Sequence, residues 1–404
     1  MSTCPTRTPV TLAVALTVAL TVALAALAGC SASGTGSSPA REASGSSPSV
    51  AHAAGHADDS PAPAPSRPLR AGERLVRLAM PEPYQPSAPY GAGTDDYRCF
   101  VLDPHLAEAA FITGMNILPG SGRAVHHVIL FRVPPSSVAA VEATDKAEKG
   151  EGWTCFGGTG VEAGGALEDA PWLGAWAPGG GEQVMPGDVG VLLEKGSRVI
   201  MQVHYNLLAD PGPDVSSAQL RLAAGTRRLA ALQTMLLPAP VELPCRPAHD
   251  QSPLCVRAAA VVDAQKRFGN DVGLTANYLH LLCGRLRPGP VQSCDRTMEK
   301  RATIRAAAGH MHLLGRSVTI QLNPGTRRAR TVLDIPAWDF DNQGAKPVGR
   351  VQLRRGDTVR VTCRHDQSLR DLLPAFAGQR ERYVVWGEGT TDEMCLGLLL
   401  VTRS

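Results

Sequence analysis

The sequence predicts an all-β protein of the β-sandwich or jelly-roll type. Short apolar runs recur along the chain and are separated by Gly, Pro and Asp, which is typical of strands and turns. Glycine (41) and proline (32) are abundant while aromatic residues make up only 4%, and this composition favours a turn-rich β protein. Residues 104–111 and 366–375 are expected to form short helices. The runs expected to form strands are Phe100–Leu102, Val128–Phe131, Val199–Met201, Val318–Ile320, Val359–Val361 and Leu398–Val401.

The N-terminus is expected to be a targeting segment. Arg7 is followed by an apolar run that ends in Leu27-Ala28-Gly29-Cys30, which resembles a bacterial lipoprotein signal. In this interpretation residues 1–29 are a signal peptide and Cys30 carries a lipid. The alternative is an uncleaved membrane anchor, because the run approaches the ~20 residues that span a bilayer. Both interpretations place the rest of the chain in the cell envelope, exposed to the periplasm or the exterior.

Residues 30–72 are expected to form a tether between the lipid and the folded body. They are rich in Ser, Gly, Ala and Pro and contain too few apolar side chains to form a core. His52 and His56 lie in this segment, and we interpret both as solvated.

The cysteines predict disulfide bonds in the folded body. Without Cys4 in the signal and Cys30 at the lipid, eight of the ten cysteines remain. An even number of cysteines in an oxidising compartment indicates four disulfides, although the sequence alone allows 105 pairings. The eight are Cys99, Cys155, Cys245, Cys255, Cys283, Cys294, Cys363 and Cys395.

Length and charge limit the function classes. A chain of 404 residues is long enough for two domains with cores of their own. The net charge is +3, from 40 basic and 37 acidic residues, and this balance argues against nucleic-acid binding.

Four short segments carry candidate metal ligands. Imidazole binds copper, zinc, iron and nickel, and a thioether adds a preference for Cu(I). Two histidines at i and i+2 share one face of a strand and can reach one metal, which points Met311 towards the core. A methionine would complete a set with two nitrogens, one sulfur and an open position. The segments are His126-His127 in AVHHVILF, His204 in IMQVHYNL, His310 and His312 in GHMHLLG, and Met394 in TTDEMCLG.

The adjacent pair His126-His127 requires an irregular strand. Neighbouring residues of a regular strand point to opposite faces, so both side chains cannot reach one metal. We therefore expect this pair at a strand end or a β-bulge, with His204 as the third nitrogen ligand.

Together the four segments resemble the copper type II, ascorbate-dependent monooxygenases, the family of peptidylglycine α-hydroxylating monooxygenase and dopamine β-monooxygenase. The family's signatures are an HH pair, a QVHY-like segment, an HxH pair and a DEMC or EEMC segment, and all four occur here in family order. Two connecting segments are also similar, Gly174–Gly179 and Arg355–Asp357 with the following Val361–Cys363. The resemblance spans about Tyr97 to Val401.

The resemblance implies two tandem antiparallel β-sandwich domains, stapled by disulfides, with one copper ion each. Residues 73–225 would hold the three-histidine centre (His126, His127 and His204), and residues 226–404 the methionine centre (His310, His312 and Met394). An external reductant such as ascorbate would supply electrons through the first centre. The second centre, whose ligands are the expected catalytic residues, would bind dioxygen and hydroxylate an activated C–H bond of a small molecule. Gln202 is expected to line the space between the metals.

The resemblance also implies two disulfides. Cys99 is expected to pair with Cys155, and Cys363 with Cys395, the neighbour of Met394. For the other four cysteines we expect the local pairs Cys245–Cys255 and Cys283–Cys294.

The substrate is expected to differ from that of the peptide-hydroxylating relative. That enzyme holds a substrate carboxylate with an arginine before its HxH pair and with an asparagine and a tyrosine after its EMC. The matching positions here are Ala308, Leu396 and Leu398, which cannot bind a carboxylate ionically. A less polar small molecule is therefore expected, unless Arg305 or Arg316 supplies a charge.

Two other functions remain open at this stage. The same ligands would serve a non-enzymatic copper-binding or copper-buffering surface lipoprotein, although two dissimilar centres favour redox chemistry. A metal-free adhesion module would leave all four motifs as coincidences. The other histidines, His105, His249, His280 and His365, are interpreted as structural or surface residues, and His365 is the one nearest the methionine centre in sequence.

Overall fold

The computed structural model describes residues 67–89, 94–161, 167, 169–209, 212–285 and 287–403, which all belong to one contact unit. The predicted signal peptide, Cys30 and residues 31–66 of the predicted tether, with His52 and His56, lie outside the described residues. No helix in the described ranges is long and apolar enough to cross a membrane.

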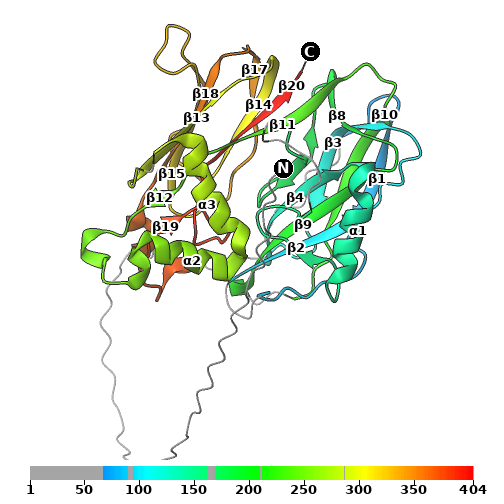
Figure 1. The fold of residues 1–404 in the computed structure, drawn as a ribbon. Coiled ribbons are helices and arrows are strands. Elements are labelled where there is room, and N and C mark those ends of the chain that lie inside the picture. Colours follow the sequence, from blue (N-terminus) through cyan, green and yellow to red (C-terminus); the bar gives the residue numbers. More distant parts are fainter. Residues whose placement is uncertain are drawn as a thin grey trace, which may run out of the picture. The chain divides into compact units, whose positions relative to one another are not determined.

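The first half of the chain forms a sandwich of two sheets (Figure 1). One sheet has the strand order β5-β2-β9-β4-β6, and the facing strands β1-β10-β3-β8 belong to a longer sheet. The apolar side chains of Phe100, Leu130, Met201 and Leu220 meet between them in a buried core. The strands are β1 (Glu73–Ala79), β2 (Asp95–Leu102), β3 (Ala110–Leu118), β4 (Val125–Val133), β5 (Trp153–Thr154), β6 (Trp172–Trp176), β7 (Gln183–Val184), β8 (Val189–Leu193), β9 (Arg198–Asn206) and β10 (Ser217–Ala224).

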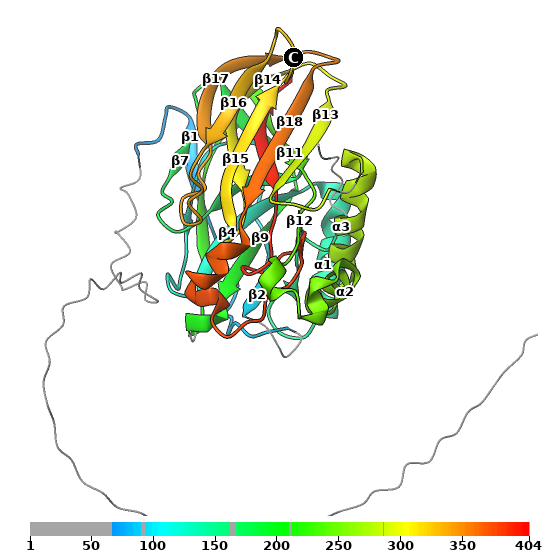
Figure 2. The same cartoon turned by 90° about the vertical axis from the view of Figure 1, so that its left-hand side faces the viewer.

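The second half repeats this architecture. Figure 2 looks onto its outer sheet, with the order β13-β18-β15-β16, which packs on β11-β20-β14-β17. Side chains alternate along β18, where every second residue is buried, as expected for a strand with one face on the core. The strands are β11 (Ala230–Pro238), β12 (Glu242–Leu243), β13 (Val291–Thr297), β14 (Ala302–His310), β15 (Gly315–Leu322), β16 (Arg330–Ile335), β17 (Lys346–Leu353), β18 (Thr358–His365), β19 (Val384–Val385) and β20 (Leu396–Thr402).

One long sheet runs through both sandwiches. The parallel pair β8–β11 joins the strands of the first half to those of the second, and every other strand pair of the described part is antiparallel. The cores nevertheless separate, with Leu232 in the first and Met235 in the second. The point on β11 where the buried side chains pass from one core to the other lies close to the predicted boundary between residues 225 and 226. That boundary between two domains stays a prediction.

The six predicted strand segments all lie within observed strands, so the all-β sandwich fold is confirmed. The helix predicted at residues 104–111 was wrong, and the short helix predicted at 366–375 is present only as two 3-10 helices. Residues 104–109 form a loop in which His105 has a positive φ of 51°, and Ala110 already begins β3. Residues 366–375 form only short 3-10 turns, at Gln367–Asp371 and Pro374–Phe376.

Three α-helices were not predicted: α1 (Val138–Ala147), α2 (Arg257–Phe268) and α3 (Asn270–Cys283). Three alanines, the residue with the highest helix propensity, follow Arg257 at the start of α2. The helix buries Ala260, Val261, Ala264 and Phe268 at helical spacing. Helices α2 and α3 pack beside β13 and β19 on the flank of the second sandwich (Figure 1).

The last residues of the predicted tether belong to the folded body. The side chain of Arg221, which is almost fully buried, donates hydrogen bonds to the carbonyl oxygens of Arg67 and Pro68 and pairs with Glu182 at 2.6 Å. The turn at 71–72 then leads into β1. Residues 67–72, the last six of the predicted tether, are therefore part of the sandwich edge.

All four predicted disulfides are present. Cys99–Cys155 joins β2 to the loop after β5, and Cys363–Cys395 joins β18 to the residue before β20. The local pairs Cys245–Cys255 and Cys283–Cys294 flank α2 and α3. The two helices are thus held to the second sandwich by a disulfide at each end.

Candidate metal centre

Strand β9 presents His204 on the face directed away from the first core. Val199, Met201, Val203 and Tyr205 point into that core, so the even-numbered side chains point to the other face. His204 is 1% exposed although it lies outside the core. It is therefore covered by other parts of the chain and has a fixed position.

A β-bulge in β4 brings His126 and His127 to the same side as His204. The register with β9 shifts between Val125 and His127, so that His127 lies opposite His204 and His126 is the additional residue. Val125 and Val128 both remain in the core, which a regular alternation would not allow. The irregularity expected from the HH pair is thus confirmed.

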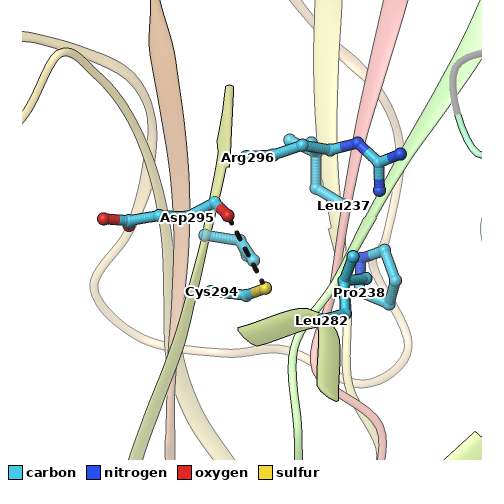
Figure 3. Close-up of a pocket in the computed structure, with 7 residues that line it drawn as sticks. Leu237, Pro238, Leu282, Cys294, Asp295 and Arg296 are labelled. Atoms are coloured by element: carbon cyan, nitrogen blue, oxygen red, sulfur yellow. Dashed lines mark hydrogen bonds between the residues drawn. The ribbon is translucent and has the colours of Figure 1, made fainter. Parts of the chain in front are cut away.

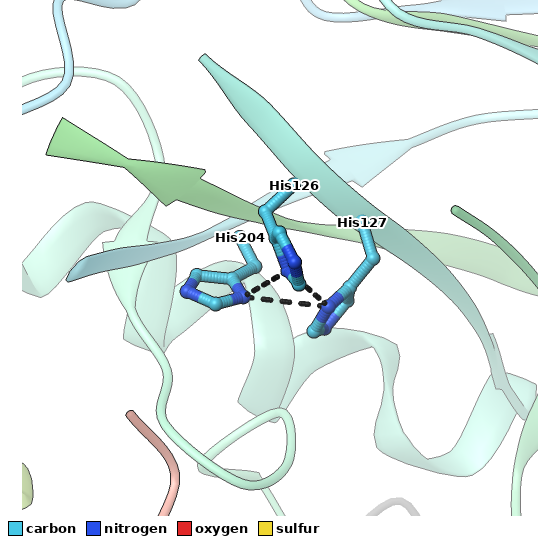
Figure 4. A group of neighbouring side chains, drawn as sticks. All are labelled: His126, His127 and His204. Carbon is cyan, nitrogen blue, oxygen red and sulfur yellow. Dashed lines mark hydrogen bonds between the residues drawn. The ribbon is translucent and has the colours of Figure 1, made fainter. Parts of the chain in front are cut away.

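The three imidazoles converge through their Nδ1 atoms (Figure 4). The Nδ1···Nδ1 distances are 3.2 Å between His126 and His204, and 3.3 Å for each of the other two pairs. Three nitrogens that bind one metal at about 2.0–2.1 Å from tetrahedral corners lie about 3.3 Å apart. The three-histidine centre therefore has the dimensions of a metal site with three nitrogen ligands.

A carboxylate fixes the tautomer of His204. Its Nε2 lies 2.8 Å from Oδ1 of Asp95, on β2, and donates a hydrogen bond to it. The Nδ1 atom of the neutral ring then carries a lone pair, as a metal ligand must. Burial by itself raises the pKa of Asp95, but hydrogen bonds from His204, Thr390 and Thr94 hold the pKa of this carboxyl below its usual range. Asp95 is thus ionised at neutral pH.

Four histidines of the two centres, His126, His127, His310 and His312, are neutral at pH 7. Burial, followed by the charge of neighbouring histidines, holds the pKa values of His126 and His127 well below the usual range. Burial lowers the pKa of His312, and it lowers that of His310 to about 3, with His312 contributing. Neutral imidazoles are the form that binds metals.

The methionine centre lies where β14 and β20 meet. His310 pairs with Leu396 at the last position of their antiparallel register. Beyond it, the backbone N–H of His312 donates to the side chain of Glu393, the residue before Met394, at 2.9 Å. The rings of His310 and His312 are 5.2 Å apart, while Met311 between them is fully buried in the second core. Both histidines therefore share one face, as expected from their spacing. Nδ1 of His312 is buried without a hydrogen-bond partner in the described part of the chain, which leaves it available to a metal.

Glu393 holds the two strand ends of this centre together. Its fully buried carboxylate accepts hydrogen bonds from the backbone N–H groups of His312, at 2.9 Å, and Leu314. His365 lies 3.3 Å from the same carboxylate and 3.2 Å from the carbonyl oxygen of Met394. His365 is therefore a structural residue behind the methionine centre.

The two centres adjoin each other in this structure. The ring centroids of His127 and His310 are 6.3 Å apart. Phe340, in the loop after β16, stacks on His126 at 4.6 Å and lies edge-on to His312 at 6.4 Å. From the same loop, Oε1 of Gln343 accepts a hydrogen bond from Nδ1 of His310 at 2.6 Å, which leaves Nε2 of His310 free to bind a metal.

The face that carries His310 is apolar along the strands. Ala308 lies opposite Leu398, and His310 lies opposite Leu396. The two arginines that could have supplied charge have partners elsewhere: Arg305 pairs with Asp188 at 2.6 Å and Arg316 with Asp366 at 2.9 Å. A substrate beside His310 would therefore meet mainly aliphatic side chains.

The remaining predicted residues take structural roles. The side-chain amide of Gln202 donates to the carbonyl oxygens of Cys155 and Gly158, so it anchors the disulfide loop. His280 pairs with buried Glu242 at 2.6 Å, His249 lies 3.5 Å from Glu381, and His105 is exposed beside Asp103.

A small pocket elsewhere in the second sandwich contains none of the six candidate ligands (Figure 3). It lies beside the Cys283–Cys294 disulfide, and Leu237, Pro238, Leu282 and Val361 make much of its wall. Its empty volume of about 210 Å³ includes open solvent. The pocket therefore offers no chemistry to either centre.

Sequence reasoning missed Asp95, Glu393, Gln343 and Phe340. A carboxylate partner is expected for a ligating histidine, but Asp95 and His204 are 109 residues apart, so the sequence does not show which acid is meant. Glu393 had a local signal, because it precedes Met394 directly.

No family model and no curated protein matches the chain. Among solved structures, a fucolectin from striped bass (Morone saxatilis) serum is 8% identical, with 82% of this chain and 97% of that chain covered and a TM-score of 0.18. An allantoicase is 11% identical, with 78% and 90% covered and a TM-score of 0.18. A triple jelly-roll protein of an archaeal virus is 9% identical, with 83% and 60% covered and a TM-score of 0.17. Likenesses at such TM-scores carry no argument about this chain.

Proposed function

We propose that the protein is a copper-dependent monooxygenase that hydroxylates an activated C–H bond of a small apolar molecule, using dioxygen and an external one-electron reductant such as ascorbate. The observation that carries the proposal is the convergence of three Nδ1 atoms at 3.2–3.3 Å beside a second, dissimilar set of ligands. Nitrogen ligands alone suit a copper ion that changes oxidation state, and the thioether of Met394 favours Cu(I). Two different centres in contact suit separate roles in electron transfer and dioxygen binding better than they suit metal storage.

The chain's own residues would prepare both centres before any metal binds. Asp95 and Gln343 each accept a hydrogen bond from one histidine ring and so present the other ring nitrogen to the metal. Glu393 fixes the backbone of His312. Bound copper would supply one-electron transfer and the activation of dioxygen.

The apolar face formed by Ala308, Leu396 and Leu398 would select the substrate. Strand pairing places these side chains next to His310, and none of the three can pair with a carboxylate. We therefore propose an uncharged, largely hydrocarbon substrate. The proposed cellular location is the cell envelope, through a lipid at Cys30.

The test begins with copper stoichiometry on the full-length chain in detergent with its four disulfides formed. Two copper ions are expected, falling to one in the His310→Ala/His312→Ala double variant. Ascorbate-dependent oxygen uptake is then measured with a series of apolar substrates. The Met394→Ile variant should remain folded but form no hydroxylated product.

Met311→Leu is the matched control, because Met311 lies beside the same histidines but points into the core. It should retain both copper ions and full turnover. Full turnover by Met394→Ile would overturn the assignment of the methionine centre. Two bound copper ions with no ascorbate-dependent oxygen uptake would favour a copper-buffering lipoprotein.

A further inference from the structure

Two residues of β2 connect the three-histidine centre to the segment that leads into Met394. Asp95 and Tyr97 lie on the same face of their strand. Oδ1 of Asp95 accepts hydrogen bonds from Nε2 of His204, at 2.8 Å, and from the hydroxyl of Thr390, at 2.7 Å. The ring of Tyr97 stacks on His204 with centroids 4.0 Å apart, and its hydroxyl donates to the carbonyl oxygen of Glu388 at 2.7 Å. His204 is therefore linked twice to the 388–390 segment.

The 388–394 segment is also held on its far side. Asp392 binds Arg267 through two hydrogen bonds of 2.6 and 2.8 Å, and it binds Arg382 at 2.8 Å. Two residues further on, the backbone of Met394 meets His365. A short stretch of chain, held by hydrogen bonds at Asp392 and Met394, therefore separates Thr390 from the thioether of Met394. A displacement of Thr390 is then passed on along this stretch.

The carboxylate of Asp95 accepts hydrogen bonds from several donors. Besides His204 and the hydroxyl of Thr390, the backbone N–H of Thr390 lies 3.3 Å from Oδ1, and the hydroxyl of Thr94 lies 2.9 Å from Oδ2. A carboxylate accepts at both oxygens, whereas an asparagine would turn an N–H₂ group towards one of these donors. Asp95 is only 7% exposed, so water cannot readily replace a hydrogen-bond partner that this carboxylate loses.

We infer that Asp95 is a positioning residue that couples the two candidate copper centres, by orienting His204 and holding Thr390 with the same carboxylate oxygen. The inference rests on the proposed function. A metal on Nδ1 of His204 would load a ring that Asp95 already holds, and the hydrogen bond from Thr390 to the same carboxylate oxygen would pass this load to the segment that leads to Met394. Filling the first centre then changes the Cu(I) affinity of the second, and the reverse holds equally, because coupling free energies are reciprocal.

The test uses the full-length chain in detergent and Cu(I) ions as the probe. The Cu(I) dissociation constant of the methionine centre is measured with the three-histidine centre filled, and again with that centre removed by His126→Ala/His127→Ala. The parent protein should show a difference of about fivefold or more. In Asp95→Asn and in Thr390→Val the two values should become equal. Asp95→Asn should also weaken the three-histidine centre about 10- to 100-fold, whereas Thr390→Val should not.

Two control variants separate coupling from a purely structural role. Thr390→Ser keeps the hydroxyl and should keep the coupling. Asp214→Asn changes another buried carboxylate, which accepts from Tyr205 and Ser216 away from the centres, and should keep it too. Equal Cu(I) dissociation constants of the methionine centre in the parent, with and without the three-histidine centre, would overturn the inference. It would also be overturned if the coupling persisted in Asp95→Asn and Thr390→Val and only their melting temperature fell. A parent protein that binds no copper would overturn the proposed function itself, and the coupling with it.

Discussion

The two candidate centres are built in opposite ways. The three-histidine centre depends on an irregularity, the bulge at His126, inside a pair of hydrogen-bonded strands. The methionine centre depends on regular i, i+2 spacing, but His312 and Met394 lie just beyond the ends of β14 and β20. One centre is thus fixed by the strand ladder, while the other lies where the ladder has stopped.

The difference shows why the methionine centre needs additional support. Past the last ladder bond, the backbone N–H groups of His312 and Leu314 would lack partners in the interior, and Glu393 accepts from both. The three-histidine centre needs no such clamp, and its supporting carboxylate, Asp95, acts on a side chain instead. Substitutions at supporting residues should therefore affect the two centres unequally.

The largest effect is expected from Glu393→Ala. Removing a fully buried carboxylate leaves the backbone N–H groups of His312 and Leu314 without their acceptor and takes away the acidic partner of His365, which should lower the free energy of unfolding by about 3–5 kcal/mol. The measurement is denaturant unfolding, followed by copper stoichiometry under native conditions. Copper should be lost first from the methionine centre.

Arg316→Ala is the control for this prediction. Arg316 lies two residues after Leu314 but forms an exposed pair with Asp366, so its loss should cost about 0–1 kcal/mol. A similar, small cost for Glu393→Ala would contradict the role of Glu393 as the clamp of the methionine centre.

A smaller effect, dependent on pH, is expected from Glu388→Gln in the segment between the centres. Burial raises the pKa of Glu388 to about 7, against the lowering effect of a hydrogen bond from Trp386. The folded state therefore keeps a proton that the unfolded state loses above its own pKa near 4.5. Stability contributed by this proton is present below that value and disappears as pH rises through about 7.

Glutamine stays neutral at all pH values, so Glu388→Gln should remove this dependence. At pH 8 the variant should be more stable than the parent, by on the order of 3 kcal/mol, whereas at pH 4 the two should be nearly equal. Thermal unfolding at several pH values measures this. A variant less stable than the parent at pH 8 would show that Glu388 is ionised and stabilising in the fold.

The smallest effect is expected from Gln343→Ala. This change removes the acceptor for Nδ1 of His310 and should weaken metal binding at the methionine centre about 10- to 100-fold, leaving the three-histidine centre unchanged. Competition with a Cu(I) chelator measures both affinities. Gln379→Ala, which removes a side-chain amide that donates to the carbonyl oxygen of Ala375, is the control. Equal weakening of both centres would mean that they do not depend on separate supporting residues.

The sequence by itself determined the features that depend on local pattern. Short apolar runs between turn residues located β2, β4, β9, β15, β18 and β20, because runs of this length are typical of strands. The adjacent histidines required a bulge, because successive side chains of a regular strand point to opposite faces. Cysteine count and spacing, with the family resemblance, gave all four disulfides.

Helices α2 and α3 were missed although a signal existed. Residues 257–268 contain three consecutive alanines and bury apolar residues at helical spacing, a pattern that differs from the short apolar runs typical of strands. The predicted helix at 104–111 was wrong because Ala110 and Phe111 at its end belong to β3. They are buried by long-range pairing with β10.

Only the tertiary structure decided which polar residues serve the two centres. Asp95 and Thr390 are separated by 295 residues, and no periodicity connects them. Their meeting depends on how the two sandwiches pack through the shared sheet. The sequence named the ligands because ligand chemistry lies in residue type and local spacing. The sequence could not identify the residues that hydrogen-bond to these ligands, such as Asp95, because a buried hydrogen bond forms only when folding brings distant segments of the chain together.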